Sequence, residues 1–244
     1  MKHTLYILLI VFTASCGISE DCLKGNGNPV TITFPFEGFS KVKVYSKIAL
    51  VVKQGDTYEV KVETRDNIRD EIEVVLEGDL LKVKDISTCN IARDYGVTTV
   101  YVTAPNIKEI YSKTEQNIKS DGVLRYPELR VLSIDDEEGA GTGDFYLDVN
   151  NEYLYIESNS VSNFYCNGEA NKMVVFFSWG DGIFYGSNLQ VQTIDVFHRG
   201  SNEMIVYPVE SLTGAIYGTG NVVLKNNPVS IDVNQLFTGS LIYN

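Results

Sequence analysis

Two glycines one residue apart, Gly218 and Gly220, form the first pattern in this sequence that could do chemistry, because glycine-rich loops cradle phosphates. A dinucleotide-binding fingerprint also needs a third glycine three residues later and a helix that begins at the loop. Residue 223 is valine, and the apolar run 222–224 is typical of a strand. Without a helix N-terminus to hold a phosphate, we interpret the two glycines as a tight turn.

The histidines and the densest group of acids give weak support for catalysis or metal binding. His198 is the only histidine outside the first three residues, and no nucleophile elbow accompanies it, so a catalytic triad is not expected. We predict a surface or corner histidine. The acidic run 135–138 is predicted to be a solvated turn, with a weak calcium site as the alternative.

A polysaccharide lyase built on a β-helix would combine calcium-binding carboxylates with a basic residue that accepts a proton. Asp181, Asp195 and Arg199 are the residues that could be assigned these roles. The formal net charge of −12 opposes an acidic sugar polymer as substrate and nucleic acid as partner. The sequence therefore predicts no catalytic residues, no metal, no cofactor and no nucleic-acid partner.

Aromatic residues recur through the second half of the chain and could stack on sugar rings or on a partner's surface. The strongest ligand-stacking candidates are Trp179, Tyr185 and Tyr207. Trp179 lies in a turn, at a position where many similar turns of the sequence have a small residue. The alternative is that these rings point inward and belong to the core.

The N-terminus has the features of an export signal. Lys2 precedes the apolar run 4–13, which is too short to span a bilayer as a helix. The residues before Cys16 resemble a bacterial lipobox, so we predict a lipoprotein signal peptide over 1–15 and acylation of Cys16. The acidic residues that follow resemble a surface-export signal, within a predicted linker 16–29. We expect anchoring to the outer membrane or cell surface through this lipid, with the periplasmic leaflet as an alternative.

Three further cysteines remain in an oxidising compartment: Cys22, Cys89 and Cys166. Cys22 opens the mature domain and Cys89 lies between two strand-like runs, so a bridge between them would join the N-terminal segment to the body. Cys166 lies in an apolar strand and is predicted to be a buried, inert thiol.

A repeated segment dominates the chain beyond residue 113. A polar or glycine-bearing turn followed by an apolar run recurs, and its anchor residues step by 19, 19, 21, 18 and 19. They are Asp144, Asn163, Gly182, Glu203, Asn221 and Ser240. A fixed period near 20 residues without helical patterns predicts an all-β, single-stranded parallel β-helix with about 19–20 residues per coil. We expect one such domain over 30–244, most regular over 113–244, with a β-sandwich as the alternative. The run 66–74 is the best helix prediction.

The turns of this repeat resemble those of a known family. The segments GTGD (141–144), GTGN (218–221) and FTGS (237–240), each followed by an apolar strand, are similar to the repeats of the head-GIN-domain auto-transporter adhesins. The segment 212–228 resembles the closing pattern of that family, and 22–27 resembles its start. The resemblance implies a right-handed β-helix without established catalytic residues.

The predicted function is a non-enzymatic, lipid-anchored envelope protein that acts as an adhesin or as a module binding a glycan or protein ligand. A carbohydrate-active β-helix enzyme is the first alternative. A structural envelope protein that self-assembles through its solenoid ends is the second.

Overall fold

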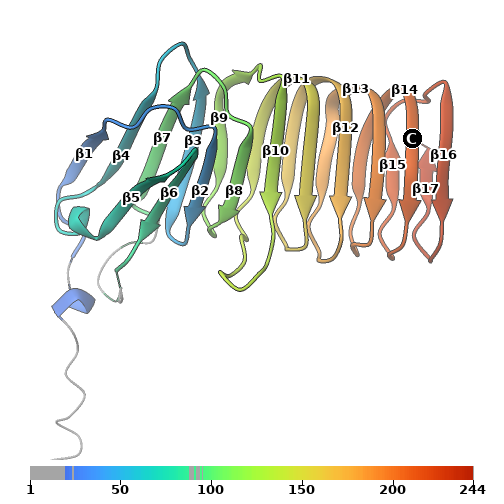
Figure 1. Ribbon diagram of the computed structural model, residues 1–244. Helices are drawn as coiled ribbons and strands as arrows, with labels where there is room; N and C mark the ends of the chain where they lie inside the picture. The colour runs from blue at the N-terminus through green and yellow to red at the C-terminus, as the bar shows by residue number, and fades with distance from the viewer. Residues whose placement is uncertain (1–19, 24, 88–90, 92–93, 95, 244) are drawn as a thin grey trace, which may run out of the picture.

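The computed structural model of the chain describes residues 20–23, 25–87, 91, 94 and 96–243. Strands stack along one axis into an elongated all-β solenoid of about 6 turns (Figure 1). From residue 109 onward the strands pair in parallel with the strands of the next coil. The prediction of a parallel β-helix is confirmed, and the β-sandwich alternative does not describe these coils.

Two facing sheets form the walls of the solenoid. Each of the long strands bends midway, so that its first half pairs within the first wall and its second half within the second wall. These strands are β11 (Phe145–Ser158), β12 (Phe164–Phe177), β13 (Phe184–His198) and β14 (Met204–Ile216). Shorter strands extend the walls: β8 (Glu109–Lys113), β9 (Ile118–Leu124), β10 (Glu128–Ser133), β15 (Val222–Leu224), β16 (Ser230–Gln235) and β17 (Leu241–Tyr243).

The strand register gives the length of a coil directly. The residues that begin the first wall pair in a single row: Phe145, Phe164, Phe184, Met204, Val222 and Leu241. Successive members of this row are 19, 20, 20, 18 and 19 residues apart. The repeat found in the sequence is therefore the physical coil, because each apolar run lies on the one before it.

The N-terminal part of the solenoid is a head with a different strand order. The first wall continues there through β3 (Ile48–Gln54), β7 (Thr98–Ala104), β4 (Glu59–Arg65) and β1 (Pro29–Phe34), and the second through β2 (Lys41–Tyr45), β6 (Leu80–Asp85) and β5 (Ile72–Glu77). Strands β4 and β5 run antiparallel to their neighbours. The sequence prediction of purely parallel coils is wrong for this head.

The helix predicted over 66–74 is absent. A short 3-10 helix, η2 (Arg69–Glu71), leads into β5, and Ile72 is buried against the core. The charged residues that suggested a helix lie in a turn and in this 3-10 helix, and the residues after them form a strand with Ile72 buried and 74–76 half-buried.

The interior between the walls is mainly apolar, and a polar seam runs along one of its edges. The seam follows the edge where the chain turns from the second wall to the first, and consists of Ser112, Ser133, Ser158, Ser160, Ser162 and His198, all buried. The Ser133 hydroxyl lies 2.8 Å from that of Ser160 and 2.9 Å from that of Ser162, so these groups satisfy one another.

Cys22 and Cys166 are the two cysteines among the described residues. Cys166 is buried, and burial raises the pKa of its thiol to about 12, as expected of an inert thiol. Cys22 is disulfide-bonded, and its carbonyl accepts a hydrogen bond from the Ile91 amide at 3.2 Å. Cys16 and Cys89 lie outside the described residues, so lipidation and the bridge to Cys89 stay predictions.

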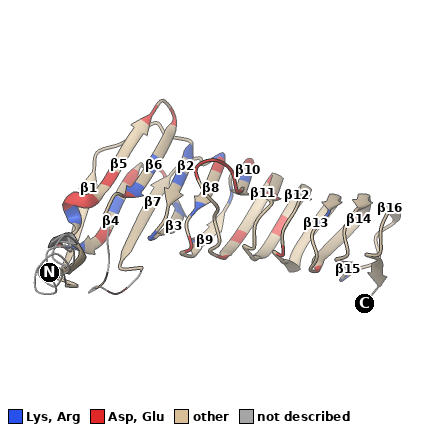
Figure 2. Cartoon of the chain, turned by 90° about the horizontal axis from the view of Figure 1, so that it is seen from below, with Lys and Arg blue, Asp and Glu red and all other residues tan. Residues whose placement is uncertain are grey.

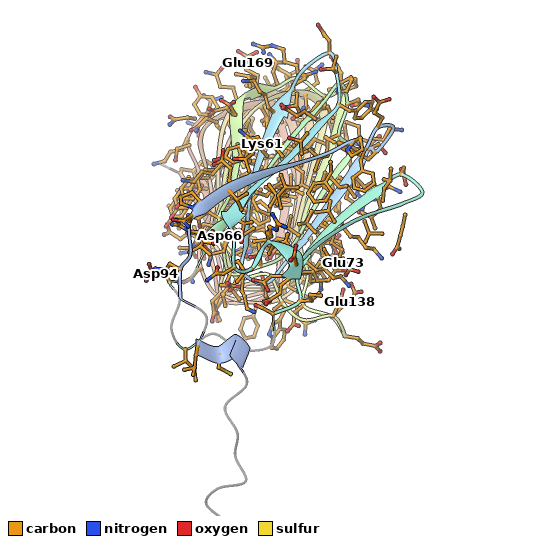
Figure 3. The ribbon with its side chains drawn as sticks, turned by 90° about the vertical axis from the view of Figure 1, so that its left-hand side faces the viewer. Lys61, Asp66, Glu73, Asp94, Glu138 and Glu169 are labelled. Carbon is orange, nitrogen blue, oxygen red and sulfur yellow. The ribbon has the colours of Figure 1, made fainter. Side chains whose placement is uncertain are left out.

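Polar contacts hold the segment before β1 to the head, and Figure 3 labels two of their acceptors, Asp66 and Asp94. The Asn28 amide donates to Asp66 at 2.9 Å, and the Asn26 side chain donates to Asp94 at 2.7 Å. No helix in the described part of the chain is long and apolar enough to cross a membrane.

Candidate functional site: an aromatic corner groove

The turns from the second wall back to the first lie above one another along one edge of the solenoid. Figure 3 shows this edge at the end of the cross-section that carries Glu138, opposite Glu169. The last four turns enclose an open groove of about 580 Å³, within the range of roughly 300–1,000 Å³ found for small-ligand sites. We call it the corner groove. It is lined by Trp179, Gly180, Asp181, Arg199, Gly200, Ser201, Tyr217, Gly218, Thr219 and Phe237.

Trp179 stands in a turn with one additional residue. In each coil, one residue ends the strand of the second wall and another begins the next strand of the first wall, and both pair with the equivalent residues of the neighbouring coils. The step between them is 6 residues over 158–164, 198–204 and 216–222, but 7 residues over 177–184. Because the coils above and below are already in register, the additional residue must bulge outward. The Trp179 side chain accordingly remains 64% exposed.

Glycines make the floor of the groove. Gly180 has φ +94°, and a Cβ there would lie 2.2 Å from the Ser160 carbonyl oxygen. At Gly218 a Cβ would lie 2.3 Å from the Gly200 carbonyl oxygen. These positions exclude side chains because successive turns approach one another so closely. The glycines first noted for their phosphate-loop spacing are therefore turn residues, and they leave a flat surface between the aromatic rings.

Arg199 supplies the positive charge of the groove. Its guanidinium Cζ lies 5.5 Å from the Trp179 ring centroid, within the range of a cation–π contact. No described carboxylate forms an ion pair with it. The neighbouring Asp181 accepts a hydrogen bond from the Ser201 hydroxyl. The groove thus combines a guanidinium with unused donors, a carboxylate and a hydroxyl.

A row of rings on the outer face of the second wall runs into the groove. Phe176 stacks on Phe197 with centroids 4.4 Å apart, and Phe197 contacts Tyr217 at 4.7 Å. Rings in such a row cover one another's faces, so they offer mainly edges to solvent. Tyr217 at the end of the row is 42% exposed and Phe237 in the next turn is 61% exposed. Together with Trp179 they supply the aromatic surface of the groove.

The other two predicted stacking residues lie elsewhere. Tyr185 belongs to a separate row on the first wall, where it stacks on Tyr165 at 4.5 Å. Tyr207 is paired in register with Gln190 on β13 and is half-buried. Neither lines the corner groove. Aromatic residues recur through this half of the sequence, but such residues can face either wall or lie in a turn, and their recurrence does not say which.

His198 lies directly beneath the groove, at the last position of β13, and is fully buried. Its Nε2 donates to the Asn202 carbonyl oxygen at 2.8 Å, while Nδ1 has no hydrogen-bond partner. Burial lowers the pKa of the imidazole, and the contact with Asn202 opposes that shift more weakly. The expectation of a corner position is confirmed, but a surface position is wrong, because the glycine turns leave internal room for a ring.

The residues considered for a lyase are not assembled into one site. Asp181 and Arg199 both line the groove, whereas Asp195 lies on the outer face of β13 and accepts a hydrogen bond from the Thr213 hydroxyl at 2.8 Å. Asp195 is not among the groove residues. The arrangement needed for that chemistry is therefore incomplete.

The acidic run 135–138 carries ion pairs with lysines of the head and the first coils. Asp136 lies 2.6 Å from the Lys113 ammonium and accepts from the Tyr111 hydroxyl at 2.6 Å. These contacts, led by that of Lys113, hold the pKa of Asp136 well below its usual range. Glu138 pairs with Lys43. Among the described residues no group of three or more metal-ligating side chains forms a cation site.

Charged side chains are distributed unevenly along the solenoid. They are frequent over the head and sparse from β12 to β16 (Figure 2). Residues 141–244 contain 3 basic residues, Lys172, Arg199 and Lys225, but 10 acidic ones. Arg199 is therefore an isolated positive group in the acidic half of the molecule.

Comparison with solved structures supports the same architecture. A putative adhesin from Bacteroides fragilis superposes with a TM-score of 0.80 at 18% identity, over 89% of this chain and 97% of that one. A putative lipid binding protein from Parabacteroides distasonis gives 0.68 at 18% identity, over 90% and 98%. A putative adhesin from Parabacteroides merdae gives 0.61 at 15% identity, over 91% and 98%. At these identities the similarity establishes the fold alone.

Sequence comparison identifies the family. No match was found among curated proteins. A family model described as "Putative auto-transporter adhesin, head GIN domain" matches residues 38–228, which is most of the solenoid and includes three of the four turns around the groove. This chain belongs to the head-GIN-domain auto-transporter adhesin family.

Proposed function

We propose that this protein is a lipid-anchored adhesin of the cell envelope that binds its ligand in the corner groove. Membership of an adhesin family and the likeness to adhesin-like solenoids fit a non-enzymatic binding role. The observation that carries the proposal is the exposed Trp179. One additional residue in its turn lifts a large ring out of a repeat that would otherwise leave the edge flat.

The surroundings of Trp179 support binding rather than packing. A large exposed aromatic ring costs free energy in water, so an exposed ring beside a concave surface is a common mark of an interaction site. Aromatic and arginine side chains together dominate binding energy at interfaces. Trp179, Arg199 and Tyr217 bring these residue types together from three successive turns.

A variant pair tests the location of the site. The full chain, solubilised in detergent, is applied to immobilised glycans, extracellular-matrix proteins and whole cells. Trp179→Ala is expected to weaken retention roughly tenfold or more, the typical loss for a central aromatic contact. Val161→Ala is the matched control, because Val161 is an exposed apolar residue of the preceding turn that does not line the groove. Equal loss in both variants, or none in either, would refute binding at the groove.

The anchor is tested separately at Cys16. If this cysteine carries the lipid, Cys16→Ala moves the protein from the membrane fraction to the soluble fraction. Fractionation that is unchanged in this variant would contradict the anchor and leave binding at the groove unaffected. Surface labelling of intact cells then separates an outward-facing protein from one held in the periplasmic leaflet.

A further inference from the structure

The chemistry of the corner groove specifies its ligand more narrowly, on the assumption that the proposed binding function is correct. We infer that the groove binds the end of a glycan that carries a single carboxylate, such as a terminal sialic or glucuronic acid. The guanidinium of Arg199 would pair with the carboxylate, while the sugar ring would lie against the exposed aromatic rings. Four features of the groove lead to this ligand class.

The first feature is the state of Arg199. Its guanidinium lies over the Trp179 ring and makes no ion pair with a described residue, so its donors are not occupied by a carboxylate of the described chain. The backbone at Arg199 is fixed, since its amide donates to the Phe177 carbonyl oxygen at 2.8 Å. A guanidinium matches a carboxylate with two parallel hydrogen bonds, which makes it selective for planar anions.

The second feature is the set of groups next to Arg199. Trp179 and Phe237 are more than half exposed, so part of each ring's surface is available to the apolar face of a sugar. Asp181 and Ser201 line the same groove, and their side-chain oxygens can accept hydrogen bonds from sugar hydroxyls. The glycine floor keeps side chains out of the space between these groups.

The third feature is the backbone along this edge, which forms turns rather than strands. The amides that begin the turns donate to the coil before, at 3.0 Å for Ser178, 2.7 Å for Tyr217 and 2.9 Å for Leu236. A peptide that binds by adding a strand needs free backbone groups and pockets for alternate side chains. The residues that line the groove belong to turns between strands rather than to an exposed strand edge, and this favours a sugar over a peptide that adds a strand.

The fourth feature is the electrostatic field, which sets a limit of one charge. Arg199 is the single basic residue among those lining the groove, in a half of the chain with 10 acids and 3 bases. One carboxylate can pair with the guanidinium, but further negative groups along the same ligand would meet an acidic surface. We therefore expect terminal acidic sugars to bind and polyuronates to be excluded.

The test compares probes that differ only in charge. The full chain in detergent is measured against surfaces carrying sialyllactose, the methyl ester of sialyllactose, lactose, a glucuronic-acid-terminated disaccharide and polygalacturonate. At least one acid-terminated probe is expected to bind roughly 10- to 100-fold more tightly than its neutral counterpart, the range for a charge-assisted hydrogen bond. Polygalacturonate is expected to bind no better than lactose.

Matched variants assign the effect to Arg199. Arg199→Gln is expected to reduce binding of the acidic probe to the level of the ester, and Arg199→Lys to retain part of the preference. Lys172→Gln is the control, because it removes one exposed positive charge from the same half of the chain outside the groove. Trp179→Ala is expected to weaken acidic and neutral probes alike.

The outcomes separate this inference from the proposed function. Equal binding of sialyllactose and its ester would overturn the inference and leave glycan binding at the groove intact. Binding to matrix protein alone, still lost in Trp179→Ala, would overturn the glycan class but not the adhesive site. Tighter binding of polygalacturonate than of any single-acid probe would refute the limit of one charge.

Discussion

His198 makes the stability of the solenoid depend on pH in a way that can be calculated. The ring is buried, Nε2 donates to the Asn202 carbonyl oxygen, and a proton on Nδ1 would be a buried charge without a partner. The native state therefore resists protonation, and the pKa falls below the ordinary value of 6.5. Because the unfolded chain binds that proton more readily, stability must fall as the pH drops through 6.5.

The size of the effect has an upper limit. If the native ring stays neutral, protonation at about pH 5.5 favours the unfolded chain by RT times the natural logarithm of eleven, about 1.4 kcal/mol. Once the pH falls below the native pKa, the loss stops growing, since both states then carry the proton. The stabilising contribution of the neutral imidazole is fully present above the pKa of the unfolded chain. It declines as the pH falls from that pKa to the pKa of the native protein.

The assay is urea unfolding from about pH 7.5 to 4.5 for the natural chain and for His198→Gln. Glutamine retains a side-chain amide that can donate to Asn202 but does not titrate, so the difference between the two curves isolates the imidazole. We expect the natural chain to lose up to about 1.4 kcal/mol relative to the variant by about pH 5.5. Nuclear magnetic resonance of the ring should show the Nε2–H tautomer.

Two results would refute this reasoning. One is an imidazole pKa at or above the ordinary value in the folded protein, which would mean that water or an anion reaches Nδ1. The other is a stability difference between natural chain and variant that is independent of pH. The sequence also contains His3, so the comparison with His198→Gln is what assigns the titration to His198.

Three further predictions concern stability and covalent structure. Gly214→Ala is expected to lower the free energy of unfolding in urea by more than about 2 kcal/mol, because φ is +121° and a Cβ would lie 2.0 Å from a backbone oxygen. The control Gly78→Ala has open space around its Cβ and should lower it by only about 1 kcal/mol. Lys113→Met should make the segment 134–139 sensitive to proteases in the otherwise folded protein. The buried Lys113 ammonium donates to the carbonyl oxygens of residues 134 and 139 at 2.5 and 2.6 Å, and the variant removes both hydrogen bonds. Unchanged resistance to proteases would contradict the role of Lys113 in holding this segment. Non-reducing peptide mapping should recover Cys22 joined to Cys89, and recovery of Cys22 joined to any other cysteine would refute the pairing.

The coils could be predicted from the sequence because their physics is repetitive. Each coil must place an apolar residue on the one before, so the row from Phe145 to Leu241 leaves a period that needs no three-dimensional information. The head could not be predicted in the same way. Strand β4 pairs antiparallel with both β1 and β7, through contacts between residues far apart in the chain that leave no period.

The site was predictable in part, and the limit is instructive. Trp179 was identifiable because it replaces a small residue at a turn, which is a local signal. The contact between Trp179 and Arg199 depends on which residues of neighbouring turns lie above one another. The additional residue in the turn of Trp179 changes how these two turns align, and the sequence alone does not show this. Tyr185 and Tyr207 also belong to the aromatic residues that recur from coil to coil, but they face other parts of the surface. Recurrence alone therefore could not exclude them from the candidate site.

The additional residue at Trp179 also explains why this edge of the solenoid, rather than another, carries the candidate site. A regular coil repeats its outward residues in rows, and stacked rings such as Phe176 and Phe197 then cover one another at 4.4 Å. Rows of this kind stabilise the stack but hide the faces that a ligand would use. A binding surface therefore needs a local departure from the repeat, with glycines that let neighbouring turns keep their register around it. The turn 177–184 has such a departure, and Gly180 with φ +94° lets the chain rejoin the stack immediately after the exposed ring.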